Sequence, residues 1–354
     1  MSERVVVAMS GGVDSSVAAA LLKKDGYDVT GVTMRVADCM ENGLSTESTD
    51  VEDARKVAEI IGIPHLVVDL RDTFHDEIVL PFVRAYARGM TPNPCITCNR
   101  KIKFGVLMQK AVEMGAAGIA TGHHARIIEH EGIKMIARGR DNDKDQSYFL
   151  FQLTHRDLGS IMFPVGEIRK EEVRRIAGQL DLPVARKKDS LEICFIPDDD
   201  YITVVEKYSR FTPPAGEIVT ADGKMVGEHG GIHRFTVGQR RGLNVALGKP
   251  MYVLELDGLN NRVLIGSKDE CRSRGLVANG VVWNYYKPFE KKMKISVKIR
   301  YQAQPVEARL FPIDDDGVEV VFDRDGPLVT PGQAVVFYKD DLVLGGGWIT
   351  GKSS

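Results

Sequence analysis

The first part of the chain alternates short apolar runs with longer amphipathic segments. Runs such as 4–9 (RVVVAM) and 64–70 (PHLVVDL) are short, apolar and β-branched, which is typical of buried parallel strands. The predicted strands are 4–9, 27–36, 64–70 and 118–122, and the predicted helices follow the first strand and cover 48–62, 75–90 and 100–115. Strands that alternate with helices indicate an α/β domain with a doubly wound parallel sheet.

The pattern changes near residue 207. Short β-branched runs now follow one another, with Gly, Asp and Pro between them, as in 251–266, 293–312 and 333–349. This spacing predicts antiparallel β-structure. We therefore expect three domains: an α/β domain over 1–206, a small, mainly β linking domain over 207–270, and a C-terminal antiparallel β-barrel over 271–354.

Composition narrows the class of protein. The 354 residues include 47 Lys and Arg against 49 Asp and Glu, so any nucleic-acid surface depends on local clusters of charge. No uncharged apolar run reaches about 18 residues, and the start of the chain lacks the form of a signal peptide. We expect a cytoplasmic protein that does not bind a membrane. Five cysteines, an odd number, argue against a disulfide framework.

The segment 10–16 (SGGVDSS) joins the first predicted strand to the first predicted helix. Gly11 and Gly12 permit a tight turn, and the N–H groups at the helix start form an anion site. We expect the hydroxyls of Ser15 and Ser16 to cap this helix. The segment has neither the lysine of a Walker A loop nor the G-x-G-x-x-G spacing of dinucleotide sites. In its strand and helix context it resembles the PP-loop of ATP pyrophosphatases, which cleave ATP to AMP and pyrophosphate.

Cys95 and Cys98 stand in C-x-x-C spacing before a predicted helix with a basic start at Arg100, Lys101 and Lys103. A helix N-terminus and these cations favour thiolates. Because no fourth Cys or His stands at a suitable spacing, we do not expect structural zinc. Cys194 lies much later in the chain. Reactive thiols beside a nucleotide domain point to sulfur transfer, in which ATP converts a carbonyl oxygen into an adenylate, a persulfide displaces AMP, and a second thiol helps to release the sulfur.

Together these motifs resemble the bacterial tRNA-specific 2-thiouridylases, the MnmA family, whose members thiolate the wobble uridine of certain tRNAs. The resemblance runs almost end to end, through TPNP, ATGHHAR, DNDKDQSYFL, LEICFI, HRFTVGQRRGL and GGGWI. It implies ATP and Mg²⁺ as cofactors and tRNA, presented through its anticodon loop, as the substrate. It also implies a sulfur-donor protein, such as a cysteine desulfurase or a sulfur relay protein, and no DNA partner.

The resemblance also assigns residues. It makes Cys98 the nucleophile and Cys194 the persulfide carrier. Met34 would contact the adenine side through its backbone, Gly122 would complete the pocket, and Asp14 would organise Mg²⁺ or phosphate. The ATP site would comprise Ala8, Met9, Ser10, Gly11, Gly12, Val13, Asp14, Ser15, Met34 and Gly122. The tRNA contacts would be His123, Lys144, Asp145, Gln146, Arg300, Tyr301 and Gln333.

Local patterns leave some of these assignments open. The run 287–301 combines several lysines and Arg300 with the ring of Tyr301, which suits an RNA backbone, but such a run equally describes a solvated face. His124 is equally compatible with a core position.

One position departs from the family. Other members have an aspartate three residues before the first catalytic cysteine, and this chain has Cys95. An alternative is therefore an iron–sulfur cluster, [4Fe-4S], on Cys95, Cys98 and Cys194, with one iron open for sulfide. Two remoter alternatives are a PP-loop ligase or amidotransferase acting on a carboxylate, and a non-catalytic RNA-binding protein with ATP as a structural ligand.

Overall fold

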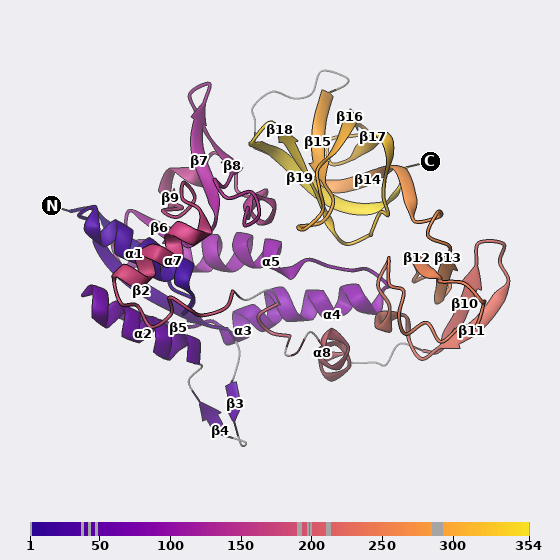
Figure 1. The fold of residues 1–354 in the computed structure, drawn as a ribbon, viewed down its shortest axis with the longest axis horizontal. Coiled ribbons are helices and arrows are strands. Elements are labelled where there is room, and N and C mark those ends of the chain that lie inside the picture. The colour runs from indigo at the N-terminus through magenta and orange to yellow at the C-terminus, as the bar shows by residue number, and fades with distance from the viewer. Residues whose placement is uncertain are drawn as a thin grey trace. The chain divides into compact units, whose positions relative to one another are not determined.

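The computed structural model of the chain describes residues 2–36, 39–41, 44–46, 49–189, 193–196, 198, 200–209, 214–284 and 293–353 (Figure 1). It divides into two compact units that are not contiguous in sequence. Unit 1 comprises 1–78, 95–195 and 341–343, and unit 2 comprises 79–94, 196–340 and 344–354. Each unit is described by itself.

Unit 1 is built on a five-stranded sheet with the order β5-β2-β1-β6-β9. Its strands are β1 (Arg4–Ala8), β2 (Asp28–Arg35), β5 (His65–Asp69), β6 (Gly118–Thr121) and β9 (Ile161–Met162). All four pairings are parallel, which confirms the predicted α/β class. The two-residue strand β9 has too little apolar sequence to be recognised as a strand from its pattern.

One face of this sheet is covered by α1 (Val13–Lys24), α2 (Thr49–Ile61) and α7 (Lys170–Gln179), whose apolar residues share a core with Val5 and Val7. Val6 is also fully buried, and the alternation of side chains along a strand directs it to the opposite face. The central strand is therefore covered on both sides, as its continuous apolar run predicts. Parallel strands bring the carboxyl ends of β1, β2 and β6 to one edge.

Two further helical stretches contain π-helical turns. The first runs through α3 (Arg71–Phe74), η1 (His75–Val79) and α4 (Leu80–Ala87), and the second through α5 (Pro94–Thr97), η2 (Cys98–Val106) and α6 (Leu107–Glu113). The sequence prediction was wrong in starting these helices at residues 75 and 100. Pro94 is accepted at a helix start because the first residues of a helix donate no internal hydrogen bond.

The remaining short elements are β3 (Cys39–Glu41), β4 (Leu44–Thr46), β7 (Ala125–His130), β8 (Ile133–Arg138), η3 (Ser147–Leu150), η4 (Leu158–Ser160), α8 (Tyr201–Tyr208) and η6 (Ile232–Arg234). Strands β7 and β8 form an antiparallel hairpin. Leu342, which belongs to unit 1, pairs with Ala137 of β8.

Unit 2 contains a small sheet and a closed barrel. The sheet has the order β11-β10-β13-β12, with β10 (Gly216–Thr220), β11 (Met225–His229), β12 (Tyr252–Asp257) and β13 (Arg262–Gly266). The barrel has the order β14-β17-β16-β15-β18-β19 and closes through the β14–β19 pairing. Its strands are β14 (Arg272–Trp283), β15 (Met293–Lys298), β16 (Val306–Pro312), β17 (Val318–Pro327), β18 (Ala334–Lys339) and β19 (Leu342–Lys352).

This arrangement confirms the predicted mainly β linking domain and terminal barrel, with one difference. The pair β10–β13 is parallel, whereas we expected antiparallel strands only. The long connection between these two strands lets the chain return in the same direction, which a short hairpin cannot do. Among the described residues, no helix has both the length and the apolar character needed to cross a membrane.

Candidate active site

The turn between β1 and α1 has the geometry of an anion site. Gly11 adopts a φ of 69°, a conformation that favours glycine, and the backbone of Asp50 packs directly against it. Gly12 is the N-cap residue, and no side chain caps the helix. The expected caps at Ser15 and Ser16 were wrong, because both hydroxyls donate to the Gly12 carbonyl, at 3.1 and 2.8 Å. The N–H groups of the first turn therefore keep no side-chain partner, as a ligand-binding helix end requires.

Gly122 and Met34 lie where the sequence places them, at the carboxyl ends of β6 and β2. A Cβ at Gly122 would stand 2.5 Å from the carbonyl carbon of Asp14 and collide with the Ser15 nitrogen, so the chain after β6 packs against the first turn of α1. Met34 is half-buried. The structure thus brings the predicted ATP residues from three strands to one edge of the sheet.

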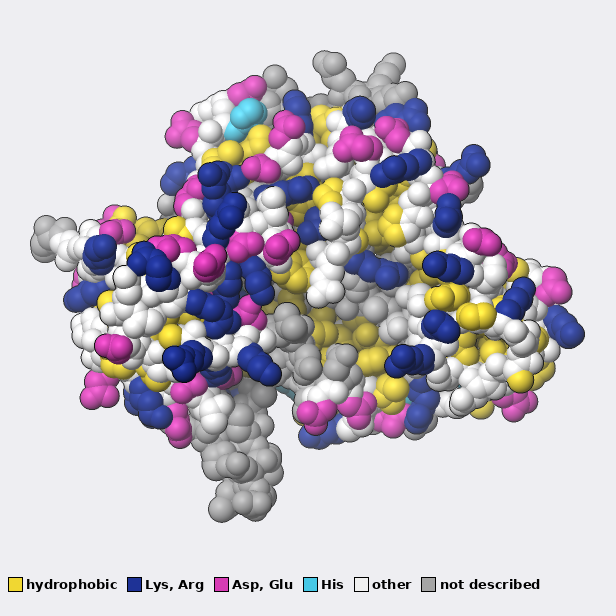
Figure 2. Space-filling model, in the orientation of Figure 1, with side chains coloured by type: hydrophobic (Ala, Val, Ile, Leu, Met, Phe, Trp, Pro, Cys, Tyr) yellow, Lys and Arg dark blue, Asp and Glu magenta, His cyan; other side chains and the backbone are white. Residues whose placement is uncertain are grey.

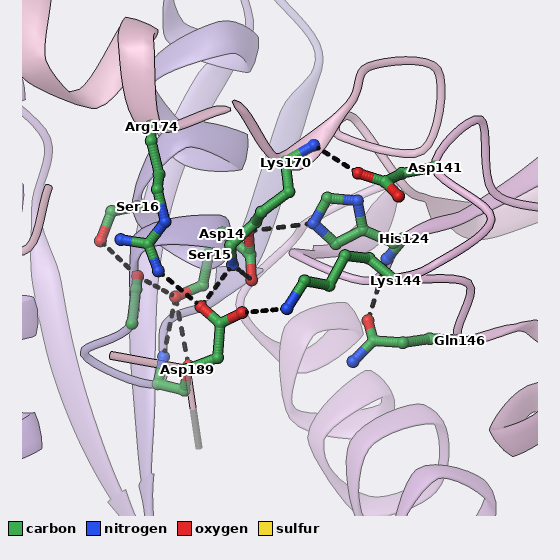
Figure 3. A network of polar contacts seen from close by, with 12 residues as sticks. Asp14, Ser15, Ser16, His124, Asp141, Lys144, Gln146, Lys170, Arg174 and Asp189 are labelled. Atoms are coloured by element: carbon green, nitrogen blue, oxygen red, sulfur yellow. Dashed lines mark hydrogen bonds and ion pairs between the residues drawn. The ribbon is translucent and has the colours of Figure 1, made fainter. Parts of the chain in front are cut away.

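Both carboxylate oxygens of Asp14 are engaged. His124 Nε2 donates to Oδ1 at 3.0 Å, and Lys170 Nζ donates to Oδ2 at 2.6 Å (Figure 3). Burial would raise the pKa of Asp14, but these two hydrogen bonds outweigh burial and lower it below its usual value. His124 is buried, as a core histidine would be, yet it contacts the candidate site.

Asp189 is the second carboxylate of this network. It accepts hydrogen bonds or ion pairs from Lys144 at 2.8 Å, Lys170 at 2.8 Å and Arg174 at 2.9 Å (Figure 3). Burial opposes ionisation, but the lysine contacts dominate and lower the pKa of Asp189 to about 2. Two residues earlier, Lys187 pairs with Asp50 and Asp53, both at 2.7 Å. Lys187 and Asp189 are therefore tied to α2 and α7, respectively.

The three candidate thiols belong to the same unit, and each influences the ionisation of another. Burial raises the pKa of Cys95 to about 11 and also raises the pKa of Cys98; both residues are half-buried, whereas Cys194 is exposed. Neighbouring thiols add to these increases, whereas the Lys103 ammonium opposes them. The expectation of thiolates was therefore wrong for this conformation, because desolvation outweighs the nearby cation.

Local geometry explains why Arg100 and Lys101 do not stabilise a thiolate. Arg100 pairs with Asp157 at 2.9 Å and Lys101 with Glu77 at 2.5 Å. The helix also begins at Pro94, so Cys98 lies beyond its first turn, where the helix dipole has faded. Cys98 and Cys194 are thiols and form no disulfide.

Several residues predicted to contact tRNA point inward. Asp145 is buried and accepts from the backbone N–H groups of Gly139 and Ser147, and Gln146 Oε1 accepts from the His124 N–H. The His123 ring is buried between Phe104 and Phe163, and burial holds its pKa well below the usual value. In this conformation these residues shape the loops around the site.

The predicted tRNA residues of unit 2 lie at the barrel. Arg300 donates to Thr330 Oγ1 at 2.5 Å, and the Lys298 ammonium lies 5.6 Å from the centre of the Tyr301 ring. Gln333 Nε2 donates to the Thr91 carbonyl at 2.8 Å, which holds the TPNP segment that leads to Cys95. Lys287, Lys291 and Lys292 of the basic run lie outside the described residues. On the face shown in Figure 2, Lys and Arg side chains lie among Asp and Glu side chains.

Comparison with known proteins decides the family. Residues 3–198 match the tRNA methyl transferase HUP domain, 203–267 the tRNA methyl transferase PRC-barrel domain, and 273–349 the aminomethyltransferase beta-barrel domain. The tRNA-specific 2-thiouridylase MnmA of Syntrophotalea carbinolica is 49% identical over 98% of this chain and 99% of its own. The chain belongs to the MnmA family of tRNA-specific 2-thiouridylases.

Other MnmA relatives agree. The Thermoanaerobacter sp. protein named MnmA 2 is 46% identical over 99% of both chains. The Geotalea uraniireducens MnmA is 46% identical over 98% of this chain and 95% of its own. The resemblance inferred from the motifs is therefore confirmed.

For a member of the MnmA family, the structure adds residues that the motifs did not indicate. Lys170, Arg174 and Asp189 complete the charged network, and Asp50 packs on the loop. In the sequence these residues lie in segments of mixed basic and acidic residues, a pattern that many solvent-exposed segments share. Within the described residues, no group of three or more His, Cys, Asp or Glu side chains is arranged to hold a metal ion.

Proposed function

We propose that this chain catalyses ATP-dependent 2-thiolation of the wobble uridine of tRNA. Membership of the 2-thiouridylase family over nearly the whole chain is the observation that carries this proposal. The uncapped start of α1 and the clustered thiols in the same unit add chemical support.

In the first step, the PP-loop holds ATP, and the C2 oxygen of uridine attacks the α-phosphate. Pyrophosphate leaves, and the base becomes an O-adenylate. The loop from Ala8 to Ser15 would bind phosphate through backbone N–H groups, with Met34 and Gly122 at the adenine side. Asp14 would organise the phosphate site by holding Lys170 and His124 in place, since its two carboxylate oxygens accept hydrogen bonds from these side chains.

In the second step, sulfur replaces the activated oxygen. A sulfur-donor protein loads Cys194 with a persulfide, whose terminal sulfur attacks C2 and expels AMP. Cys98 then attacks the Cys194 sulfur, which leaves 2-thiouridine and a Cys98–Cys194 disulfide for an external thiol to reduce. Because burial raises the pKa of Cys98, its attack requires deprotonation or a change of surroundings on binding.

The two inorganic groups differ in how well this chain fits them. Mg²⁺ usually binds through phosphates and water with one or two carboxylates, so the nucleotide site needs no dedicated protein cage. An iron–sulfur cluster needs three converging thiolates. Cys95, Cys98 and Cys194 do not fit it in this conformation, since the described residues include no group of three such side chains arranged to hold a metal.

The test is single-turnover thiolation of an unmodified tRNA transcript under anaerobic conditions, with ATP, a persulfide donor and a measurement of iron. Cys194→Ser and Cys98→Ser should lose thiolation to the level of the reaction without protein. Cys271→Ser, a cysteine of unit 2, is the matched control and should keep wild-type activity.

The remaining outcomes separate the alternatives. Thiolation that requires iron would establish the cluster scheme and make Cys95→Ser inactive. Full activity of Cys194→Ser would overturn the persulfide scheme. Release of pyrophosphate on addition of a carboxylic acid, without tRNA, would favour a ligase. Binding of ATP and tRNA without cleavage of ATP would favour an RNA-binding protein.

A further inference from the structure

The carboxylate of Asp189 gathers three cations beside the PP-loop. Lys144, Lys170 and Arg174 all contact it within 2.9 Å, and they come from a loop and from helix α7 (Figure 3). The Lys170 side chain is only 9% exposed and Asp189 is 23% exposed, whereas Arg174 and Lys144 are 34% and 37% exposed. Lys170 and Asp189 therefore lie mostly outside water, and the other two cations are open to solvent.

One carboxylate of this cluster takes three cations. Asp189 contacts Lys144, Lys170 and Arg174, while Lys170 also contacts Asp14 through its ammonium and Asp141 through its backbone N–H. Three cations that converge on one point suit an anion with more charge and more acceptor oxygens than a carboxylate, such as a phosphate.

The position of the cluster indicates which anion. Lys170 bridges Asp189 to Asp14, which stands in the first turn of α1 beside the uncapped N–H groups. The loop itself has no Walker lysine, so charge for the terminal phosphates of a nucleotide must come from elsewhere. Arg174 is held in place because it also donates to the carbonyls of Ala185 and Lys187. A fixed guanidinium suits bidentate contact with phosphate.

We propose that Lys144, Lys170 and Arg174 form a polyphosphate subsite for the β- and γ-phosphates of ATP, and that Asp189 occupies it as an internal anion before the nucleotide binds. This inference rests on the proposed function only in taking ATP as the nucleotide. On binding, the phosphates replace the Asp189 carboxylate on these cations.

The first test titrates the full-length protein with pyrophosphate, α,β-methylene ATP and AMP. Arg174→Gln should lower the affinity for the first two ligands by about tenfold or more, the usual effect of losing a charge-assisted hydrogen bond. The affinity for AMP should not change. Arg174→Lys should recover part of the loss. Arg175→Gln is the matched control, because Arg175 stands on the same helix and pairs with Glu172 at the surface. Lys144→Gln, a more exposed position, repeats the test if Arg174→Gln does not fold.

The second test predicts a gain in affinity. Asp189→Asn removes the internal competitor and should raise the affinity for pyrophosphate and the ATP analogue by about threefold or more. If the role of Asp189 were merely structural, the substitution would lower both affinities.

The proposal is overturned if Arg174→Gln changes AMP and pyrophosphate equally or changes neither, or if Asp189→Asn weakens both polyphosphate ligands. A wild-type protein that binds the analogue but does not thiolate tRNA would overturn the proposed function alone. A wild-type protein that binds no nucleotide would overturn both.

Discussion

At Gly122, the absence of one side chain decides how closely β6 approaches the PP-loop. A Cβ would stand 2.9 Å from Asp14 Cβ and 2.5 Å from its carbonyl carbon, and backbone cannot move aside cheaply. We predict that Gly122→Ala lowers the free energy of unfolding by about 1–3 kcal/mol and weakens ATP binding. Gly178→Ala, at an open position of α7, should be neutral or stabilising by up to about 1 kcal/mol. Urea unfolding and nucleotide titration of both variants check this, and equal behaviour would contradict it.

The raised thiol pKa values predict how the rate of alkylation depends on pH. With a pKa of about 11, only about one Cys95 in a thousand is a thiolate at pH 8. Because iodoacetamide reacts with the thiolate, alkylation of Cys95 should still accelerate between pH 9 and 10. Glutathione, measured in parallel, should approach its plateau there. Peptide-resolved mass spectrometry gives the rates, and a Cys95 plateau at pH 8 would show that its thiolate is stabilised.

At the scale of elements, ion pairs hold residues 187–189. Asp189 pairs with Arg174 of α7, and Lys187 pairs with Asp53 of α2. A carboxylate whose pKa is lowered stabilises the fold above its unfolded pKa of about 4, and this contribution is lost as pH falls toward about 2. We predict that wild type loses more stability than Asp189→Asn between pH 4 and pH 2. The difference should be about 1 kcal/mol, allowing for solvent screening. Urea midpoints across this range check it, and parallel acid curves would refute it.

At the scale of the whole molecule, each unit is built from stretches of chain that are not contiguous in sequence. Residues 79–94 belong to unit 2, where Tyr86 stacks on Tyr201 at 4.5 Å and a Cβ at Gly89 would stand 3.1 Å from Ile232 and Leu256. The division into domains at 206 and 270 stays a prediction. We expect a fragment of residues 1–206 to expose the apolar side of α4, bind a hydrophobic dye and aggregate. Co-expression with 207–354 should restore solubility, whereas a sharply melting, dye-free fragment would show that it folds alone.

The sequence best predicts those structural features that depend on residues adjacent in the chain. The β1 strand, the glycine turn and α1 follow one another, so their pattern predicts the loop and its edge of the sheet. Lys170 and Asp189 reach the same site from far along the chain, and no local pattern connects them to Asp14. The thiol pKa values also depend on tertiary burial. Local cations therefore predicted the wrong direction for Cys98.

The raised thiol pKa values have a consequence for the survival of the protein in an oxidising cell. Peroxide attacks thiolates, and the first product, a sulfenic acid, proceeds to irreversible forms when no partner thiol intercepts it. Cys95 and Cys98, half-buried and held as S–H groups, are slow targets while no substrate is bound. The burial that makes these sulfurs poor nucleophiles at rest thus preserves them between encounters with substrate.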